Sequence, residues 1–592
     1  MFRRLCVAIL GCVVVATAGT AVPAAAAAGS VVINEIHYNP ADSFDLLVPP
    51  LDVEFLELHN PGDTPVDLSG MSFVGFDLVF PPNTTLLPGA YEIVAPVAAD
   101  AIAAWGVAPL TEFIAGGISG GGELIQLLAA DGTTVVDQVL YDDVAPWPGA
   151  PDGNGPSLEL INPAFDNADP ASWGASLNDI PTPGAQNSIF AELPPPTIEN
   201  TRTEPTALTP GTPFDVAAEI PDAVAPQVYY TLNIAEPESG PVAMTSDGNG
   251  TWRAPIPGQA GGTLVRFRVV DGDLQAPKAT DTIDYFGAVV ADPDLATTQM
   301  KVVQFWVEDS EYDRIYSDKL SEEEIPAVIS YGGQVIDNAR FRQRGGTSRN
   351  FVKRNYKIEL PDGYLIDFGE EGHYPLDEFN LQADRGDVPY TQTLVSWDVA
   401  AAEGEADIVN FHVRAERNGD FFGLYRIQEA YDGTFRSQNG FDDGEFHKVG
   451  KDGWNQPDST KGWEKKNPDD LDYTAITAAG VAVRDSDYEA RTAWAYQNID
   501  IPSVINYSAL TALLRHGDSA RKNWYAHLDG DTEQWSQMLW DLDQTWLWYS
   551  TGPCPDDDLT IPTCLGNPFL NSILEVPELE ELYWRRIQTL VD

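Results

Sequence analysis

Short apolar runs, interrupted by glycine, proline, asparagine or aspartate, fill the chain from Val31 to about Asn187. Examples are VVINEIHYNP, VEFLELHNPG, MSFVGFDLVF, ELIQLLAADG and TTVVDQVLY. Runs of this length with turn-forming residues between them are typical of strands joined by tight turns. The pattern therefore predicts a β-sandwich as the first domain.

The pattern of residues changes twice after this region. The proline-rich stretch ELPPPT at 192–197 reads as a linker, and the alternating runs VYYTLNI and TLVRFRVVDGD predict a second sandwich that ends near Tyr285. Beyond about Thr297, the segments DYEARTAWAYQ and SVINYSALTALLRHG carry apolar residues at helical spacing. We therefore expect two all-β domains followed by an α+β domain, in which the chemistry lies.

The first 28 residues have the form of a secretory signal peptide. Arg3 and Arg4 precede an apolar run from Leu5 to Val15, and the small residues of AVPAAAAA follow it. A lipoprotein anchored through Cys12 is the alternative, but the apolar run continues past that cysteine. We expect a secreted or surface-located protein, and no later segment approaches the roughly 20 apolar residues of a transmembrane helix.

The rest of the composition is consistent with an exported chain. Only Cys554 and Cys564 remain after the signal, and their closeness in CPDDDLTIPTC predicts a local disulfide. The 34 Lys and Arg residues face 90 Asp and Glu residues, for a net charge of -56. Such a surface repels nucleic acids and anionic membranes, so we expect neither as a partner.

One basic stretch, RFRQRGGTSRNFVKRNYK at 340–357, stands out in so acidic a chain. It holds seven of the 34 basic residues within 18 positions and contains no acid. Its two glycines allow close backbone approach, its hydroxyls can donate, and the strand-like NYKIEL carries Lys357. Together these suit a phosphate cradle. The alternative is a basic patch that pairs with the acidic domains.

Two later stretches suggest how such a cradle would work. Glu429, in GLYRIQEAYD, could hold Lys357 in place as the Lys and Glu pair does in kinases, although an ordinary surface role is the alternative. HGDSARKN has the H-x-D-x-x-x-x-N spacing of the kinase catalytic loop, with Asp518 as the catalytic aspartate and Asn523 as a magnesium ligand.

The apolar stretch MLWDLDQTWLW supplies two more acids. Asp541 would bind magnesium together with Asn523. Asp541 and Asp543 lie two residues apart, so on a regular strand they would share a face and both could serve as ligands. The alternative is that WDLD merely caps a strand.

Several blocks of the first domain resemble the lamin-tail domain, an immunoglobulin-like sandwich, over about residues 31–188. They are INEIHYNP, EFLELHNPGDTPVDLSGMSF, LLPGAYEIV, GPSLELINP and TPGAQNS. The resemblance implies an accessory or adhesion module with no chemistry, which could meet a cell-wall or surface partner. Glu35, Glu54 and Glu57 alternate in these blocks, and we interpret them as a solvated face rather than cation ligands.

Five ordered blocks over about 299–592 resemble the spore coat protein H (CotH) kinases, atypical members of the protein kinase-like fold. They are RGGTSRNFVKRNYKIEL, DEFNLQADRGD, GLYRIQEAYD, HGDSARKNWYAHLD and WDLDQTW. The resemblance implies that ATP and Mg2+ are used, that Lys357 binds the nucleotide phosphates, and that Glu429 is its partner. It further implies Asp518 as the catalytic aspartate and Asn523 and Asp541 as metal ligands, with Arg344 and Ser348 as weaker nucleotide contacts.

The sequence thus predicts a multidomain protein in which all-β immunoglobulin-like sandwiches precede an α+β atypical kinase-like domain. The expected parts are a signal peptide at 1–28, a lamin-tail-like sandwich at 29–190, a linker at 191–197, an immunoglobulin-like domain at 198–290 and a CotH-type domain at 298–592.

The expected activity is transfer of the γ-phosphoryl group of ATP to Ser or Thr of a basic, serine-rich surface or coat protein. Two alternatives stay open. One is a surface binding or adhesion protein with an inactive kinase-like domain, and the other is an AMP transferase that uses the same site.

Overall fold

The computed structural model describes residues 31–592 except for 41–52, 114–115, 145, 193–196, 222, 280, 388, 442–443, 451–461, 469–471, 517–518, 520–521 and 547–567. The chain divides into two compact units, one ending at Pro195 and the other beginning at Pro196. The predicted signal peptide and the predicted pairing of Cys554 with Cys564 lie outside the described residues. Among the described helices, none combines the length and apolarity needed to cross a bilayer.

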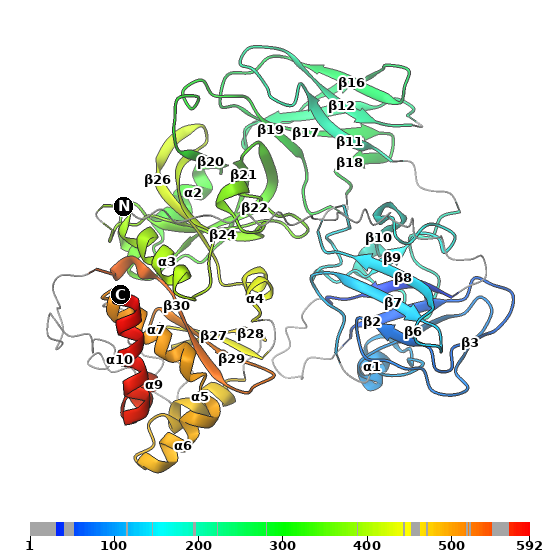
Figure 1. Cartoon of the computed structure of the whole chain (residues 1–592). Helices are drawn as coiled ribbons and strands as arrows, with labels where there is room; N and C mark the ends of the chain where they lie inside the picture. The colour runs from blue at the N-terminus through cyan, green and yellow to red at the C-terminus, as the bar shows by residue number, and fades with distance from the viewer. Residues whose placement is uncertain are drawn as a thin grey trace, which may run out of the picture. The chain divides into compact units, whose positions relative to one another are not determined.

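The first unit is a β-sandwich built from two main sheets and one strand pair (Figure 1). The first sheet has the order β10 (Trp173–Ala175), β9 (Leu158–Leu160), β1 (Val32–His37), β2 (Phe55–His59) and β6 (Tyr91–Val94). The second has the order β4 (Ser72–Val74), β7 (Glu123–Leu128) and β8 (Val135–Tyr141), and β3 (Val66–Asp67) pairs with β5 (Thr85–Leu86). Helix α1 (Ala98–Trp105) follows β6.

The prediction of a solvated glutamate face in this sandwich is wrong. Glu35 lies opposite Glu57 on β2 and Glu159 on β9, and all three side chains are fully buried. The segment that follows β10 covers this face and donates hydrogen bonds to every one of the three carboxyls: Thr182 N–H to Glu35 at 2.8 Å, Gly184 N–H to Glu57 at 2.6 Å and the Ser188 hydroxyl to Glu159 at 2.8 Å. Periodicity alone could not reveal this cover.

The second unit begins with another β-sandwich. One sheet has the order β11 (Glu199–Glu204), β12 (Phe214–Glu219), β16 (Thr251–Ile256) and β15 (Thr245–Ser246). The other has the order β14 (Ser239–Ala243), β13 (Gln227–Leu232), β17 (Leu264–Asp271) and β18 (Leu274–Ala276), and β19 (Phe286–Val289) also pairs with β17. Its core is formed by inward-facing apolar residues of both sheets.

A closed seven-stranded barrel follows, in the order β20–β21–β22–β23–β24–β26–β25. Its strands are β20 (Lys301–Trp306), β21 (Ile325–Tyr331), β22 (Gln334–Arg344), β23 (Asn355–Glu359), β24 (Glu378–Gln382), β25 (Asn410–Arg417) and β26 (Asp420–Glu429), with helix α2 (Asp309–Ser317) after β20. β20 closes the barrel by pairing in parallel with β25. The β25–β26 hairpin turns at Asn418 and Gly419, whose positive φ angles of 54° and 87° suit this Asn-Gly pair.

The sandwich and the barrel share buried contacts within the second unit. Leu264 of β17 packs with Trp306 and Val328 of the barrel. Arg266 of β17 forms an ion pair with Asp337 of β22 at 2.9 Å, and the Asp337 side chain is only 2% exposed. The second sandwich and the barrel therefore each bury part of the other's surface.

The C-terminal part combines a sheet of order β28–β27–β29–β30 with helices (Figure 1). The strands are β27 (Glu445–Val449), β28 (Trp463–Asn467), β29 (Trp524–Leu528) and β30 (Trp535–Leu539). The helices are α3 (Gln392–Ala402), α4 (Gly433–Asn439), α5 (Thr474–Ala482), α6 (Tyr488–Asn498), α7 (Ile501–Leu513), α9 (Pro568–Leu574) and α10 (Pro577–Val591). The predicted helical stretches correspond to α6 and α7, and the predicted order of β-sandwiches before an α+β domain is what the structure shows.

Candidate nucleotide-binding site

A cavity of about 460 Å³ lies between the barrel and the C-terminal sheet. Tyr431, Tyr525 and Trp540 supply aromatic surface, whereas most of the other lining side chains are charged. Six of the lining residues are cations: Arg342, Arg344, Arg349, Lys357, Lys448 and Lys466. In a chain of net charge -56, this is a local reversal of charge that favours an anionic ligand.

Strand register determines which side chains Lys357 can meet. Lys357 of β23 lies opposite Asn380 of β24, which in turn lies opposite Gln428 of β26. Directly opposite residues share a face of a sheet, and successive residues alternate between faces. Glu429 therefore points to the face opposite Lys357.

The expected pairing of Lys357 with Glu429 is thus wrong. Glu429 is fully buried and accepts hydrogen bonds from the Tyr374 hydroxyl at 2.5 Å and from Val409 N–H at 2.9 Å. Burial raises the pKa of Glu429 to about 7, a shift that these hydrogen bonds partly oppose. Its environment is that of a structural carboxyl between β25 and β26.

Glu378 is the acid that the structure brings to Lys357. The lysine forms ion pairs with Glu378, at the start of β24, and with Glu359 at 3.1 Å. Burial opposes the charge on Lys357, but the two carboxylates outweigh it, so the pKa of the lysine is raised. Glu378 was missed, although it lies in the block DEFNLQADRGD. Only the antiparallel register of NYKIEL against EFNLQ would have pointed to it.

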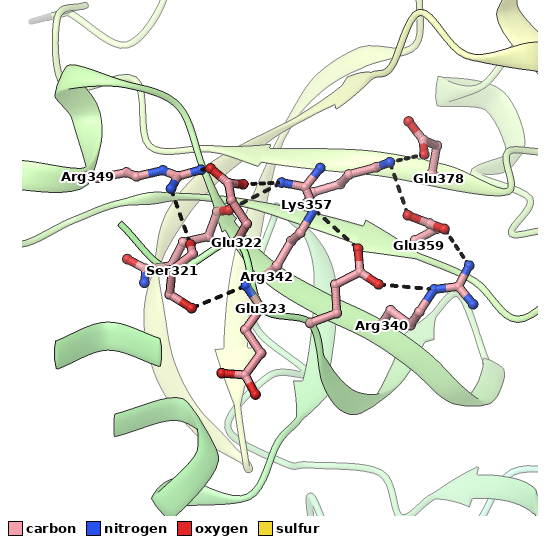
Figure 2. Close-up of polar contacts among 11 residues, drawn as sticks. Ser321, Glu322, Glu323, Arg340, Arg342, Arg349, Lys357, Glu359 and Glu378 are labelled. Atoms are coloured by element: carbon pink, nitrogen blue, oxygen red, sulfur yellow. Dashed lines mark hydrogen bonds and ion pairs between the residues drawn. The ribbon is translucent and has the colours of Figure 1, made fainter. Parts of the chain in front are cut away.

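The Lys357 pairs belong to a continuous chain of alternating charges across β22, β23 and β24 (Figure 2). Glu322 bridges Arg349 at 2.5 Å and Arg342 at 3.3 Å. Glu324 bridges Arg342 at 3.3 Å and Arg340 at 3.5 Å. Arg340 then joins Glu359, which joins Lys357. Glu322 and Glu324 thereby neutralise much of the basic stretch from within the same domain, whereas the alternative interpretation expected its partners in the acidic domains.

Arg344 differs from the other cations of the basic stretch in its hydrogen bonding. Lys353 donates to the Ala383 carbonyl at 2.8 Å and Arg354 to the Tyr316 carbonyl at 2.6 Å. The Nη1 atom of Arg344, by contrast, is buried and has no hydrogen-bond partner among the described residues. Burial lowers the pKa of its guanidinium, and Asp541 partly opposes this effect.

Lys448 of β27 faces the same part of the cavity from the C-terminal sheet. Its ammonium group lies 5.7 Å from the centre of the Trp540 ring, and the Arg344 guanidinium lies 5.8 Å from that centre. Burial and the neighbouring Arg344 lower the pKa of Lys448 to about 8, while Glu464 and Asp541 act in the opposite direction. No pattern in the sequence points to Lys448, because the apolar and polar residues around it in EFHKV give no signal.

The loop between β22 and β23 forms one end of the cavity. Gly345 and Gly346 line it, and Gly345 has a φ of +90°, which favours glycine. Ser348 lies in a short 3-10 turn (Thr347–Asn350), and its hydroxyl would be 2.2 Å from any Cβ at Gly345. The predicted contact residue Ser348 therefore packs against the glycine that approaches the cavity.

Asn523 and Asp541 lie at one end of the β29–β30 hairpin. Trp524 pairs with Leu539, Asn523 immediately precedes the first of these strands, and Asp541 follows the second after Trp540. Both have left-handed backbone, with φ of 63° and 57°. Non-glycine residues in this conformation are frequent at functional sites. The hairpin thus places two of the predicted metal ligands at the same end, while Asp518 lies outside the described residues.

The expected shared face of Asp541 and Asp543 is wrong, because the strand has ended before either of them. β30 stops at Leu539, and Asp543 belongs to a 3-10 turn (Leu542–Gln544). A Cβ placed at Gly386 would lie 3.5 Å from the Asp543 carboxylate, so this acid lies against the ADRGD loop.

His516, in the predicted catalytic loop, is fully buried, and its ring nitrogen Nε2 lies 3.4 Å from the Trp540 carbonyl oxygen.

The donor set fits a nucleotide with its divalent cation. The buried Nη1 of Arg344 needs an acceptor, which a phosphate oxygen would supply. A carboxylate and an amide oxygen, from Asp541 and Asn523, are the hard ligands that Mg2+ prefers. Within the described ranges alone, no three His, Cys, Asp or Glu side chains are placed to hold a metal ion.

Comparison with known families confirms the resemblance for two segments of the chain. Residues 341–592 match the family model described as CotH kinase protein, and residues 24–143 match the Lamin Tail Domain model. The first match begins inside β22, later than the start expected near 298. The protein therefore carries a CotH kinase domain and a lamin tail domain.

The remaining comparisons add little. No curated protein matches the sequence. Among solved structures, the twitchin kinase region from C. elegans (Fn31-NL-kin-CRD-Ig26) is 9% identical, with 59% of this chain and 52% of that chain covered and a TM-score of 0.12. The match spans about half the length of that chain.

Proposed function

We propose that this protein, with its CotH kinase domain and its lamin tail domain, is a secreted protein kinase that transfers the γ-phosphoryl group of ATP to Ser or Thr of a surface or coat protein. The observation that carries the proposal is the basic cavity between barrel and sheet, in which the buried Arg344 Nη1 has no partner among the described residues. A phosphate group satisfies this donor, and the aromatic residues of the cavity suit a base.

Some residues of the site would bind the nucleotide and its metal ion, and another would orient the acceptor hydroxyl. Lys357, held by Glu378 and Glu359, offers a fixed positive charge to the inner phosphates of ATP. Asn523 and Asp541 would hold Mg2+, which offsets charge on the phosphates when bound. Asp518 would orient the acceptor hydroxyl and take its proton. The bond from phosphorus to the bridging oxygen of ADP breaks, and a bond from phosphorus to the hydroxyl oxygen forms.

The acceptor is proposed to be basic and rich in serine. The net charge of -56 attracts Lys and Arg around a phosphorylation site, chiefly by increasing the rate of encounter. An affinity that does not fall with rising salt concentration would remove this argument. Export through the predicted N-terminal signal peptide would place the enzyme outside the cytoplasm, so the acceptor would have to be exported as well.

The test is to incubate the mature protein with Mg2+, γ-labelled ATP and a basic serine-rich peptide, beside an Asp541→Ala variant. Label in the peptide or the protein that is absent with the variant is the expected result. In a parallel reaction, label transferred from α-labelled ATP would instead indicate AMP transfer. No label from either nucleotide, together with no nucleotide binding, would favour a surface binding protein with an inactive kinase-like domain.

A further inference from the structure

Two cations of the cavity, Arg344 and Lys448, lie outside the network of ion pairs. Arg342, Arg349 and Lys357 are ion-paired within the network, and Lys466 pairs with Glu464 at 2.5 Å. The Nη1 atom of Arg344 is buried without a hydrogen-bond partner among the described residues, and the ammonium group of Lys448 faces the Trp540 ring and the cavity. The two are therefore available to an external anion.

The two cations approach each other from different parts of the domain. Arg344 ends β22 of the barrel, and Lys448 lies in β27 of the C-terminal sheet. Each lies within 6 Å of the centre of the Trp540 ring, at 5.8 Å and 5.7 Å. Two partly desolvated like charges repel each other, so an anion between them lowers the free energy of this arrangement.

Strand geometry places Arg344 beyond Lys357 along the cavity, and Lys448 lies across the same Trp540 ring. Arg342 lies directly opposite Lys357, and Arg344 is two residues further along β22, opposite Asn355. Two residues of a strand span about 6.6 Å. Asp541 is the carboxylate that most favours the charged form of Arg344, against the effect of burial on the pKa of its guanidinium. A nucleotide with its inner phosphates at Lys357 and its metal at Asp541 would extend its outermost phosphate toward Arg344 and Lys448.

We infer that Arg344 and Lys448 form a subsite for the terminal phosphoryl group of a nucleoside triphosphate and thereby distinguish ATP from ADP. The inference deepens the proposed function and rests on it. Lys448 is a binding residue that the family resemblance did not assign. Since the barrel contributes one cation and the C-terminal sheet the other, the terminal phosphate would also hold the two parts of the domain together.

The experiment measures the dissociation constants of ATP, ADP and AMP by calorimetry, with Mg2+ present, for the whole mature protein and three variants. Lys448→Gln is expected to weaken ATP binding about 10- to 100-fold, since it removes a charge-assisted hydrogen bond, and to change ADP and AMP binding less than about threefold. Lys448→Arg keeps the charge and should restore most of the selectivity for ATP. Lys466→Gln, whose ammonium is already held by Glu464, should cost less ATP affinity than Lys448→Gln.

Equal losses for ATP, ADP and AMP in Lys448→Gln would overturn the inference, because a merely structural lysine would affect all three. Unchanged ATP affinity would also overturn it. If the wild-type protein binds no nucleotide, the proposed function fails, and pyrophosphate then decides the subsite on its own. If the wild-type protein binds pyrophosphate and Lys448→Gln does not, an anion subsite at Lys448 is still supported. If the wild-type protein does not bind pyrophosphate either, the subsite is overturned together with the proposed function.

Discussion

At the scale of single residues, the site depends on which charges are already paired. The network running from Arg349 to Glu378 satisfies most of the basic stretch internally. A phosphate must therefore compete with carboxylates at some positions, while at Arg344 it meets no competitor among the described side chains. Two predictions follow from this difference.

The first prediction concerns the partner of Lys357. Glu378→Gln should weaken ATP binding or lower the phosphorylation rate by about tenfold or more, because the lysine loses the carboxylate that orients it. Glu429→Gln should change either quantity less than about twofold, since Glu429 contacts Tyr374 and Val409 instead. Nucleotide titration and initial rates of label transfer measure both effects. The opposite ranking of the two variants would restore the Lys357–Glu429 pair.

The second prediction concerns Glu322, which lies at the cavity and binds two of its arginines. Glu322→Gln should tighten ATP binding by about three- to tenfold, because the phosphates no longer displace a carboxylate from Arg349 and Arg342. Glu323→Gln is the matched control, since Glu323 pairs with Arg314 instead. Isothermal titration of both variants provides the comparison. Weaker binding in Glu322→Gln would mean that Glu322 orients the arginines for the ligand.

At the scale of elements, the glutamates of β1 and β2 make the first sandwich sensitive to pH. Burial raises the pKa of Glu35 to about 7 and that of Glu57 to about 9. The folded state therefore binds more protons than the unfolded state above about pH 4.5. Stability is highest at the acidic side of this window and falls as pH rises toward the folded-state values.

The third prediction is that the free energy of unfolding of the first unit decreases between pH 5 and pH 8. The slope is about 1.4 kcal/mol per pH unit for each carboxyl that keeps its proton only in the folded state. Glu57→Gln should flatten the dependence, whereas Glu192→Gln, at an exposed position, should not. Denaturant unfolding monitored at several pH values gives the slope. Stability that rises or stays constant over this range would contradict the buried cluster.

Much of the element-level structure could be predicted from sequence, and the exceptions share a physical cause. The sandwich strands, the strand around Lys357 and helices α6 and α7 follow from periodicity, which is a local property. Other features depend on which segments lie side by side in the fold. They are the burial of Glu35, the sheet face to which Glu429 points, and the turn at Asp543. Glu378 and Lys448 were missed for the same reason, because their neighbours are distant in sequence.

At the scale of the whole molecule, the barrel and the second sandwich form one unit. The family match begins at residue 341, whereas barrel closure requires β20 and β21, which lie before it. Removing these strands would expose the edges of β22 and β25. Unpaired strand edges promote aggregation.

The fourth prediction is that a fragment spanning 341–592 is insoluble or fails to unfold cooperatively, whereas a fragment spanning 198–592 folds. Circular dichroism during thermal unfolding and size-exclusion chromatography distinguish the two. A third fragment, 298–592, retains the barrel but leaves Asp337 without Arg266, and it should be less stable than 198–592. Equal stability of the two longer fragments would show that the sandwich contributes nothing to the barrel.

The buried ion pair between Arg266 and Asp337 also bears on how such a protein can change during evolution. A recombination that joined this barrel to another leading domain would strand Asp337 without a counter-charge, unless a second change replaced it. The proline-rich stretch near residue 195, by contrast, lies where the first compact unit ends and the second begins. We therefore expect recombination to separate the lamin tail domain from the rest of the chain more readily than it separates the second sandwich from the barrel.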